Sequence, residues 1–308
     1  MRIIAVTNQK GGVGKTTTVV NLGGALAEKG RKVILMDLDP QAHLTSYMGV
    51  DITSLKHTSY DVLRRSATIQ QVLMPIRGKI QLLPAGLELA AAEQELVSVV
   101  GRETILRDAI GAYEQQADYL FMDCPPSMGL LTLNALSAVR EVFIPVQPHF
   151  LSLQGLSHLL ESILLVHKRI NRDLRVTGLL FCMYDGRTSL AGEIARDIET
   201  FFTHDSGDDC PWRDIRIFDT RIRGNIKLAE SPSYGQTIYE YAPYCHGAED
   251  YMALAEEVEA MTAQDITCAV PEENEPWAQA LEKEQAAADT QERPPTSEKP
   301  DAALEEKK

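Results

Sequence analysis

The segment from Gln9 to Thr17 holds the residue types best suited to binding a phosphate. It reads Gln-Lys-Gly-Gly-Val-Gly-Lys-Thr-Thr and lies between an apolar run and a stretch with helical spacing. Glycines permit backbone conformations in which successive N–H groups point at one anion, and the following helix adds its positive N-terminal end. The phosphate-binding residues predicted here are Lys10, Gly11, Gly12, Val13, Gly14, Lys15, Thr16 and Thr17.

Lys15 and Thr16 follow the last glycine of this loop. In phosphate loops of this type, the lysine reaches the β- and γ-phosphates of a nucleotide and the next hydroxyl binds Mg²⁺. A glycine-rich turn without a ligand is the alternative. The Gly-Lys-Thr sequence between a strand and a helix favours a site for a nucleoside triphosphate with magnesium.

Three aspartates come at the ends of two further apolar runs. Asp37 and Asp39 end the segment that begins at Lys32, and Asp123 ends the run 119–123. Ligands of α/β proteins bind beyond the carboxyl ends of parallel strands. Each aspartate alone could cap a helix. Together beside a phosphate loop they suit phosphoryl transfer, which needs positioning and charge neutralisation more than covalent chemistry.

Apolar runs and helical stretches alternate through residues 1–261. Short apolar runs between longer amphipathic segments are typical of βαβ units, which place helices on both faces of a mostly parallel sheet. We therefore expect an α/β fold in a single domain. The predicted strands are 2–7, 32–37, 80–83, 119–123, 141–146, 176–183 and 215–218. The predicted helices are 15–29, short helices within 59–74, 87–98, 103–115, 130–138, 153–170, 190–202 and 248–261.

Residues 262–308 differ in composition from the rest of the chain. They hold twelve acidic and five basic residues with five prolines, so half of the net charge of −14 lies there. High charge and few large apolar residues are typical of disorder. We expect a disordered acidic tail with one short helix at 277–288. Trp277 and Leu281 could form a docking stripe there, and a solubilising tail without a partner is the alternative.

Composition also excludes several classes of protein. The acidic balance and 6% aromatic content argue against a wholly basic or aromatic-stacking nucleic-acid module. The five cysteines are scattered, without spacing for zinc or an iron–sulfur cluster. No apolar stretch reaches the length of a membrane span, and no targeting signal is recognisable. We expect a cytoplasmic protein with reduced thiols.

The phosphate loop resembles the deviant Walker A motif of the ParA/MinD superfamily. Gln9 stands where the ordinary motif has its first glycine, and Lys10 precedes a Gly-Gly pair. In that superfamily, the extra lysine crosses a dimer interface to the partner's phosphates. The resemblance implies a P-loop ATPase that forms a homodimer when ATP is bound, with Lys10, Lys15 and Asp39 as catalytic residues. A solvated surface lysine is the alternative for Lys10.

The same resemblance assigns the three aspartates. It implies that Asp39 orients the attacking water. Asp37 would lie near magnesium, Thr16 would bind it, and Asp123 would hold it through a water. The segment Asp123-Cys124-Pro125-Pro126-Ser127 is similar to the Walker B and switch segment of the family.

Three later segments narrow the resemblance. Residues 141–156, 183–188 and 228–243 are similar to the small chromosomal ParA proteins, often called Soj. This resemblance covers residues 1–261. It implies an ATP-hydrolysing DNA-partitioning protein whose dimer binds the nucleoid without sequence preference. A ParB-like partner would stimulate hydrolysis.

One stretch departs from the family pattern near the expected adenine pocket. The chain reads Ile222-Arg223-Gly224-Asn225, where relatives usually have Ile-Pro-Arg-Asn. In relatives this stretch lies near adenine and the DNA-facing surface. We expect Met183 and Arg223 to line the nucleotide site.

Residues 212–230 are the candidate DNA surface. They hold five bases against three acids, and such a local patch can bind phosphates on an acidic protein. The predicted DNA-binding residues are Arg213, Arg216, Arg221, Arg223 and Lys227. A second cluster at 166–175 is better explained as bases that complement a helix dipole. Only nine residues precede Lys10, so we expect no helix-turn-helix and no operator binding.

Two other functions remain open. One is a MinD-like or protein-cargo-positioning ATPase, and the MinD-like form would require a basic amphipathic C-terminal helix at the membrane. The acidic tail argues against membrane binding. A nucleotide-switched interaction module that recruits partners through the tail is the other alternative. A reductase of the nitrogenase iron-protein type is disfavoured, because Cys124 has no paired cysteine for a shared cluster.

Overall fold

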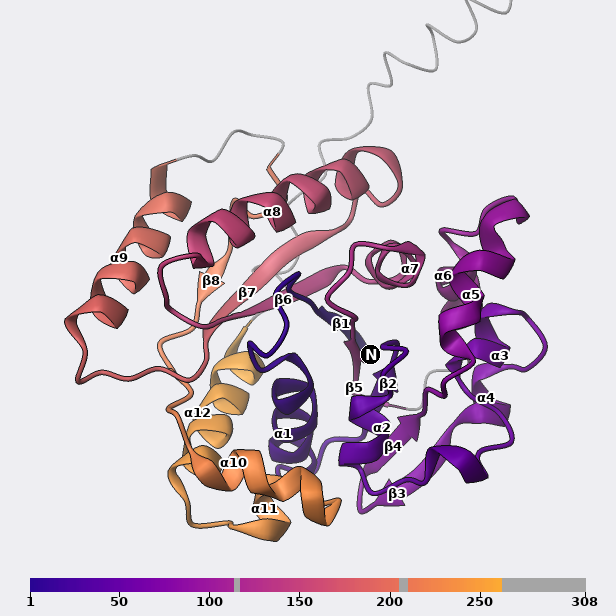
Figure 1. The fold of residues 1–308 in the computed structure, drawn as a ribbon, viewed down its shortest axis with the longest axis horizontal. Helices are drawn as coiled ribbons and strands as arrows, with labels where there is room; N and C mark the ends of the chain where they lie inside the picture. Colours follow the sequence, from indigo (N-terminus) through magenta and orange to yellow (C-terminus); the bar gives the residue numbers. More distant parts are fainter. Residues whose placement is uncertain (114–116, 205–209, 262–308) are drawn as a thin grey trace, which may run out of the picture. The chain divides into compact units, whose positions relative to one another are not determined.

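A single sheet of eight strands organises the described chain (Figure 1). The computed structural model describes residues 1–113, 117–204 and 210–261. The strand order is β3-β4-β2-β5-β1-β6-β7-β8. The strands are β1 (Arg2–Val6), β2 (Val33–Asp37), β3 (Met74–Arg77), β4 (Ile80–Leu83), β5 (Tyr119–Asp123), β6 (Glu141–Val146), β7 (Arg175–Phe181) and β8 (Arg216–Ile217).

Helices connect the strands and cover both faces of the sheet. The longer helices are α1 (Lys15–Glu28), α5 (Leu89–Glu95), α6 (Ile105–Gly111), α7 (Leu130–Ala138), α8 (Ser152–Arg169), α9 (Ser189–His204) and α12 (His246–Ala260). The short ones are α2 (His43–Tyr47), α3 (Ser59–Leu63), α4 (Ile69–Val72), α10 (Ile226–Glu230) and α11 (Ile238–Tyr241). Three 3₁₀ turns lie at Ile52–Ser54, Leu96–Ser98 and Ser231–Tyr234.

Successive residues of the central strands enter two separate hydrophobic cores. In β1, Ile4 and Val6 pack with α1 and α12, whereas Ala5 packs with the helices of the opposite face. Figure 1 shows α1, α10, α11 and α12 gathered on one side, with α7 and α8 across the sheet. Strands buried on both faces must be apolar at consecutive positions. This is why they read as continuous apolar runs in the sequence.

The expected α/β class is confirmed, with one difference at the sheet edge. β3 pairs antiparallel with β4, while the other pairings are parallel. No strand was predicted at Met74–Arg77. The hairpin turns at Gly78, whose φ is 52°. Pro75 is tolerated because β3 is an edge strand, where a missing N–H faces no neighbour.

Short helices account for most of the other differences. α2, α10 and α11 were not predicted, because four or five residues span too few turns to display a helical period. The predicted helix 103–115 is observed as Ile105–Gly111, and residues 114–116 lie outside the described part. The predicted tail at 262–308, with its helix at 277–288, also lies outside the described residues. In the described ranges, every helix is too short or too polar to cross a bilayer.

Gly178 of β7 provides a test of the packing that supports the site. A Cβ at this position would lie 2.6 Å from Phe218 and 2.7 Å from Phe143, whose rings meet edge to face. We predict that Gly178→Ala lowers the free energy of unfolding by about 1–3 kcal/mol because the core is overpacked. Urea denaturation followed by circular dichroism measures the change.

Gly155 in α8 is the matched control. A Cβ there meets no atom within 4 Å, so Gly155→Ala relieves the helix penalty of glycine and is expected to stabilise by up to about 1 kcal/mol. An unchanged urea midpoint in Gly178→Ala would contradict the packing argument.

Candidate nucleotide-binding site

The loop between β1 and α1 adopts a conformation that depends on its glycines. Gly12 and Gly14 have φ of 73° and 97°, in the left-handed region that side chains disfavour. Gly14 is also the N-cap of α1, and a Cβ there would approach Cys182 Sγ to 3.4 Å. A Cβ at Gly11 or Gly12 would meet nothing, so both face open space. The loop can therefore present backbone N–H groups to a ligand.

Asn8 ties the start of the loop to the neighbouring strand. Its amide nitrogen donates to Pro145 O at 2.8 Å, and its side-chain oxygen accepts from Lys10 N at 3.0 Å. Pro145 lies in β6 beyond Phe143, the last β6 residue paired with β1. Because β1 has ended there, the Pro145 carbonyl is available to Asn8. Sequence reasoning did not single out Asn8, whose role depends on a partner 137 residues away.

The ammonium of Lys15 lies against the loop itself. Lys15 is buried, and its Nζ donates to Lys10 O at 3.2 Å. Burial lowers the pKa of Lys15, although Asp123 and Asp39 counteract this effect. A cation withdrawn from water in this way favours an anionic ligand beside it.

Thr16 and Asp123 form a hydrogen-bonded pair beneath the loop. Thr16 Oγ1 donates to Asp123 Oδ2 at 2.6 Å. Asp123 Oδ1 is buried and has no hydrogen-bond partner within residues 1–113, 117–204 and 210–261. Burial, followed by the neighbouring charge of Asp37, raises the pKa of Asp123 well above its usual range. An unsatisfied carboxylate oxygen beside a hydroxyl suits Mg²⁺, a hard cation that binds oxygen ligands and retains waters.

Both carboxylate oxygens of Asp37 accept hydrogen bonds from residues of the segment that follows β2. Oδ1 accepts from Asp39 N at 3.1 Å. Oδ2 accepts from Thr45 N at 2.8 Å and from Thr45 Oγ1 at 2.7 Å. Burial raises the pKa of Asp37 to about 6, while the Thr45 and Asp39 hydrogen bonds act in the opposite direction. Asp37 therefore holds the loop that carries Asp39.

Asp39 lies at the wall of a cavity of about 600 Å³. Its Oδ1 accepts from Gln41 N at 2.9 Å. Six of the predicted loop residues line the same cavity, namely Gly11, Gly12, Gly14, Lys15, Thr16 and Thr17. Lys10 and Val13 do not line it, and Asp37 and Asp123 are buried behind its wall.

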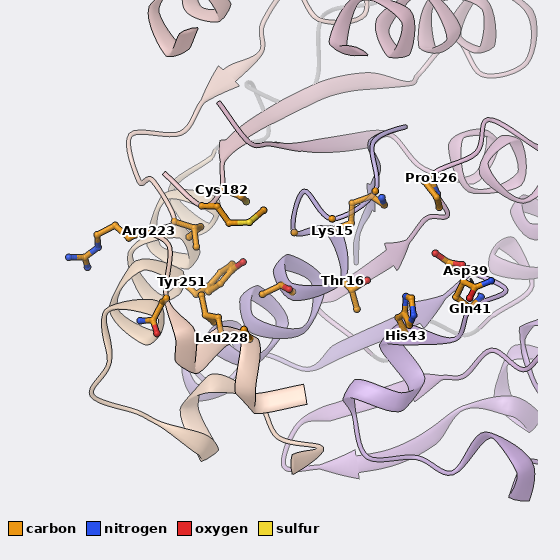
Figure 2. A pocket seen from close by; sticks show the side chains of 18 residues that line it. Lys15, Thr16, Asp39, Gln41, His43, Pro126, Cys182, Arg223, Leu228 and Tyr251 are labelled. Atoms are coloured by element: carbon orange, nitrogen blue, oxygen red, sulfur yellow. Dashed lines mark hydrogen bonds between the residues drawn. The ribbon is translucent and has the colours of Figure 1, made fainter. Parts of the chain in front are cut away.

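The cavity has a polar end and an apolar end. Figure 2 shows Asp39, Gln41 and His43 on one side of Lys15 and Thr16. Cys182, Leu228 and Tyr251 lie on the other side. A volume of this size, apolar over much of its wall with polar groups concentrated at one end, is typical of small-molecule sites. Its two ends match the base and the phosphates of a nucleotide.

Several residues that line the cavity were not predicted from the sequence. Tyr251 lies in α12, and its hydroxyl meets Thr18 Oγ1 at 3.2 Å across 233 positions of the chain. No local pattern could reveal that contact. Gln41 and His43 directly follow the Asp-Pro turn, and their closeness to Asp39 was the available signal.

Met183 and Arg223 both lie at the apolar end of the cavity, but their side chains are oriented differently. Met183 lines the cavity with a positive φ of 50°. The Arg223 guanidinium turns away from the cavity (Figure 2). It pairs with Asp250 at 2.6 Å and with Glu249 at 3.3 Å. Arg223 therefore lines the cavity as expected, but its guanidinium is directed at Asp250 and Glu249.

Acidic side chains lie beside the basic residues of the candidate DNA surface, and two of these acids come from distant segments. Arg216 lies 3.6 Å from Glu257, Arg221 lies 3.3 Å from Glu199, and Lys227 lies 2.9 Å from Glu230. Arg213 is also engaged in a contact. Counting charges along 212–230 missed the acids of α9 and α12. The patch is therefore less positive than its sequence suggests, although exposed pairs of this kind are weak and can exchange partners.

Lys10 extends toward the loop between β6 and α8. Its Nζ contacts the ring of His149, at 3.4 Å from Nδ1 and closer to Nε2. Phe150 and Leu151 follow in that loop with 84% and 55% of their surface exposed. Lys10 thus contacts the loop that carries an exposed apolar pair, and it does not line the cavity.

Comparisons with known proteins agree with this geometry. A family model described as an AAA domain matches residues 1–176. Sporulation initiation inhibitor protein Soj of Bacillus subtilis is 43% identical over 260 residues, which cover 84% of this chain and 98% of that protein. Chromosome partitioning protein ParA of Myxococcus xanthus is 39% identical over 258 residues, which cover 83% of this chain and 87% of that protein.

A solved structure extends the similarity to the fold. Cobyrinic acid a,c-diamide synthase from Mycobacterium smegmatis, with bound ATP analogue and magnesium, has a TM-score of 0.71 at 33% identity. The match covers 84% of this chain and 94% of that one. The phosphate loop, the buried carboxylates and the near full-length similarity lead to one conclusion: this chain belongs to the ParA/Soj family of chromosome-partitioning P-loop ATPases.

Proposed function

We propose that this protein hydrolyses ATP with Mg²⁺ in order to partition DNA. The observation that carries the ATPase proposal is the Thr16–Asp123 pair beneath the phosphate loop, with one buried Asp123 oxygen unsatisfied by any of the described residues. A buried polar group without a partner is costly, and a metal-bound water would satisfy it. The related synthase with bound ATP analogue and magnesium supports the same ligands.

The residues of the site take separate roles in this proposal. The loop N–H groups and the Lys15 ammonium bind the phosphates, while the apolar end receives adenine. Thr16 and Asp123 hold Mg²⁺, which when bound would draw charge from the phosphate oxygens. The carboxylate of Asp39, at the cavity wall, orients the attacking water. This arrangement relies on positioning and electrostatics, as phosphoryl transfer requires.

Dimerisation is the second part of the proposal. Lys10 does not line the cavity of its own subunit, and it contacts the loop that carries exposed Phe150 and Leu151. In the family an extra lysine at this position reaches the partner's phosphates. We infer that ATP joins two copies and that Lys10 then leaves His149 to neutralise charge on the partner's nucleotide.

DNA binding and a stimulating partner complete the proposal. We propose that the ATP dimer binds nucleoid DNA without sequence preference through Arg213, Arg216, Arg221, Arg223 and Lys227. The pairs of Arg221 with Glu199 and of Lys227 with Glu230 are exposed, and such pairs are weak enough to exchange for phosphates. Arg216 and Arg223 pair with the less exposed Glu257 and Asp250, so their contacts with DNA would have to compete with those acids. A ParB-like protein would stimulate hydrolysis and release the DNA.

Lys15→Ala tests the phosphate site. We predict that kcat for ATP hydrolysis falls about 100- to 1000-fold, because one charge-stabilising group is lost from the transition state. A phosphate-release assay measures the rate. Lys32→Ala, at an exposed lysine before β2, is the matched control and should retain activity. Comparable rates in the two variants would refute the assignment of Lys15.

Asp123→Asn tests the magnesium site. We predict that the half-saturating Mg²⁺ concentration for hydrolysis rises about 10- to 100-fold, as expected when a residue supporting the metal is altered. Asp118→Asn is the control, since Asp118 precedes the other end of β5 and accepts from Lys32 N. An unchanged magnesium dependence in Asp123→Asn would argue against this site.

Combined Arg213→Ala and Arg216→Ala substitutions test the DNA surface. With ATP, we predict weaker binding to DNA of any sequence and a salt dependence whose log–log slope is shallower by about 2, because two phosphate contacts are lost. Fluorescence anisotropy across a salt series measures both. Lys168→Ala with Arg169→Ala is the control pair, because both side chains are exposed at the C-terminal end of α8. Equal DNA binding with and without nucleotide would contradict the proposed ATP dependence.

A further inference from the structure

Asp37 is a buried carboxylate whose three hydrogen-bond donors all come from one short segment. Asp39 N supplies one donor, and the backbone and side chain of Thr45 supply the other two. The segment between these donors turns through Ala42, which has a φ of 50°. A left-handed alanine is disfavoured on its own, so the surrounding contacts must hold it in place.

Thr45 connects this segment to a second strand. It is fully buried, and its Oγ1 donates to Asp37 and accepts from Ala85 N at 2.9 Å. Ala85 follows β4, the parallel neighbour of β2. A hydroxyl can donate and accept at once, whereas an aliphatic group of the same shape can do neither. Thr45 therefore links the carboxyl ends of β2 and β4 through one atom.

The consequence of this link falls on Asp39. The backbone of Asp39 is held by Asp37 Oδ1, and its carbonyl accepts from Ala42 N at 2.8 Å. The hydrogen bonds of Thr45 with Asp37 and Ala85, called the clamp below, fix the far end of the same turn. The position of the Asp39 carboxylate at the cavity wall therefore depends on Asp37 and Thr45, which do not line the cavity.

We propose that Thr45 is a positioning residue for ATP hydrolysis and acts through Asp37 on the turn that carries Asp39. The three hydrogen bonds that Asp37 accepts come from this turn, and we therefore assign Asp37 to the clamp and not to direct magnesium binding. Asp123, with one buried oxygen that accepts no hydrogen bond from the described part of the chain, keeps the role at the metal. The inference rests on the proposed ATPase function.

Thr45→Val is the principal test. It preserves side-chain shape but removes one donor from Asp37 and leaves the buried Ala85 N–H unpaired. We expect kcat to fall about 10- to 100-fold, because misplacement of about 1 Å at a reacting group has effects of that size. Affinity for a non-hydrolysable ATP analogue should stay near that of the wild type. Thr45→Ser, which keeps the hydroxyl, should restore most of kcat.

A structural role alone would lower analogue affinity and kcat together, and that outcome would overturn the proposal. Wild-type kcat in Thr45→Val would also overturn it. If Thr45→Val does not fold, Thr45→Cys replaces it, because a thiol is a weaker donor and acceptor than a hydroxyl. Equal kcat in Thr45→Cys and Thr45→Ser would then count against the clamp.

A magnesium titration separates the clamp from the metal site. We expect Asp37→Asn to lower kcat at saturating Mg²⁺ without changing the half-saturating concentration. A rise as large as that of Asp123→Asn would overturn the assignment of Asp37. If the wild-type protein itself hydrolyses no ATP, the proposed function fails. If the wild type is active and the Thr45 variants match it, only this inference fails.

Discussion

The register of three parallel strands is the constraint on which the site depends. Val6, Asp123 and Asp37 lie side by side at the carboxyl ends of β1, β5 and β2. The phosphate loop begins directly after this row. A shift of one residue in either pairing would turn the neighbouring side chain to the opposite face of the sheet. The apolar residues of both cores therefore hold the chemical groups in place.

This register brings two carboxylates together away from water. The arrangement is unfavourable unless each carboxylate finds hydrogen-bond donors or positive charge. Asp37 is satisfied by three donors from its own turn, whereas Asp123 has Thr16 on one oxygen and, among the residues that the structure describes, no donor on the other. The two aspartates look alike in the sequence, but their hydrogen-bond surroundings differ, and this difference is the basis of the separate roles that we propose for them.

At the candidate DNA surface, folding brings acidic side chains beside basic ones and so offsets part of the positive charge of the segment. Along the chain, residues 212–230 have an excess of positive charge. In the fold, Glu199 of α9 and Glu257 of α12 lie beside Arg221 and Arg216. Charge counted along a segment omits charges that arrive from other elements. The local field at this surface therefore depends on helix packing, which the segment itself does not encode.

The sequence by itself determined the α/β class, the central strands and the phosphate loop. These features are local: a doubly buried strand needs consecutive apolar residues, and a phosphate loop needs glycines at particular steps. Tertiary structure alone decided that Thr45 donates to Asp37, that Arg223 pairs with Asp250 and that Tyr251 lines the cavity. The edge strand β3 and the short helices also emerged only there. Most of these features depend on contacts between residues that are far apart in the sequence, and a local sequence pattern does not predict such contacts.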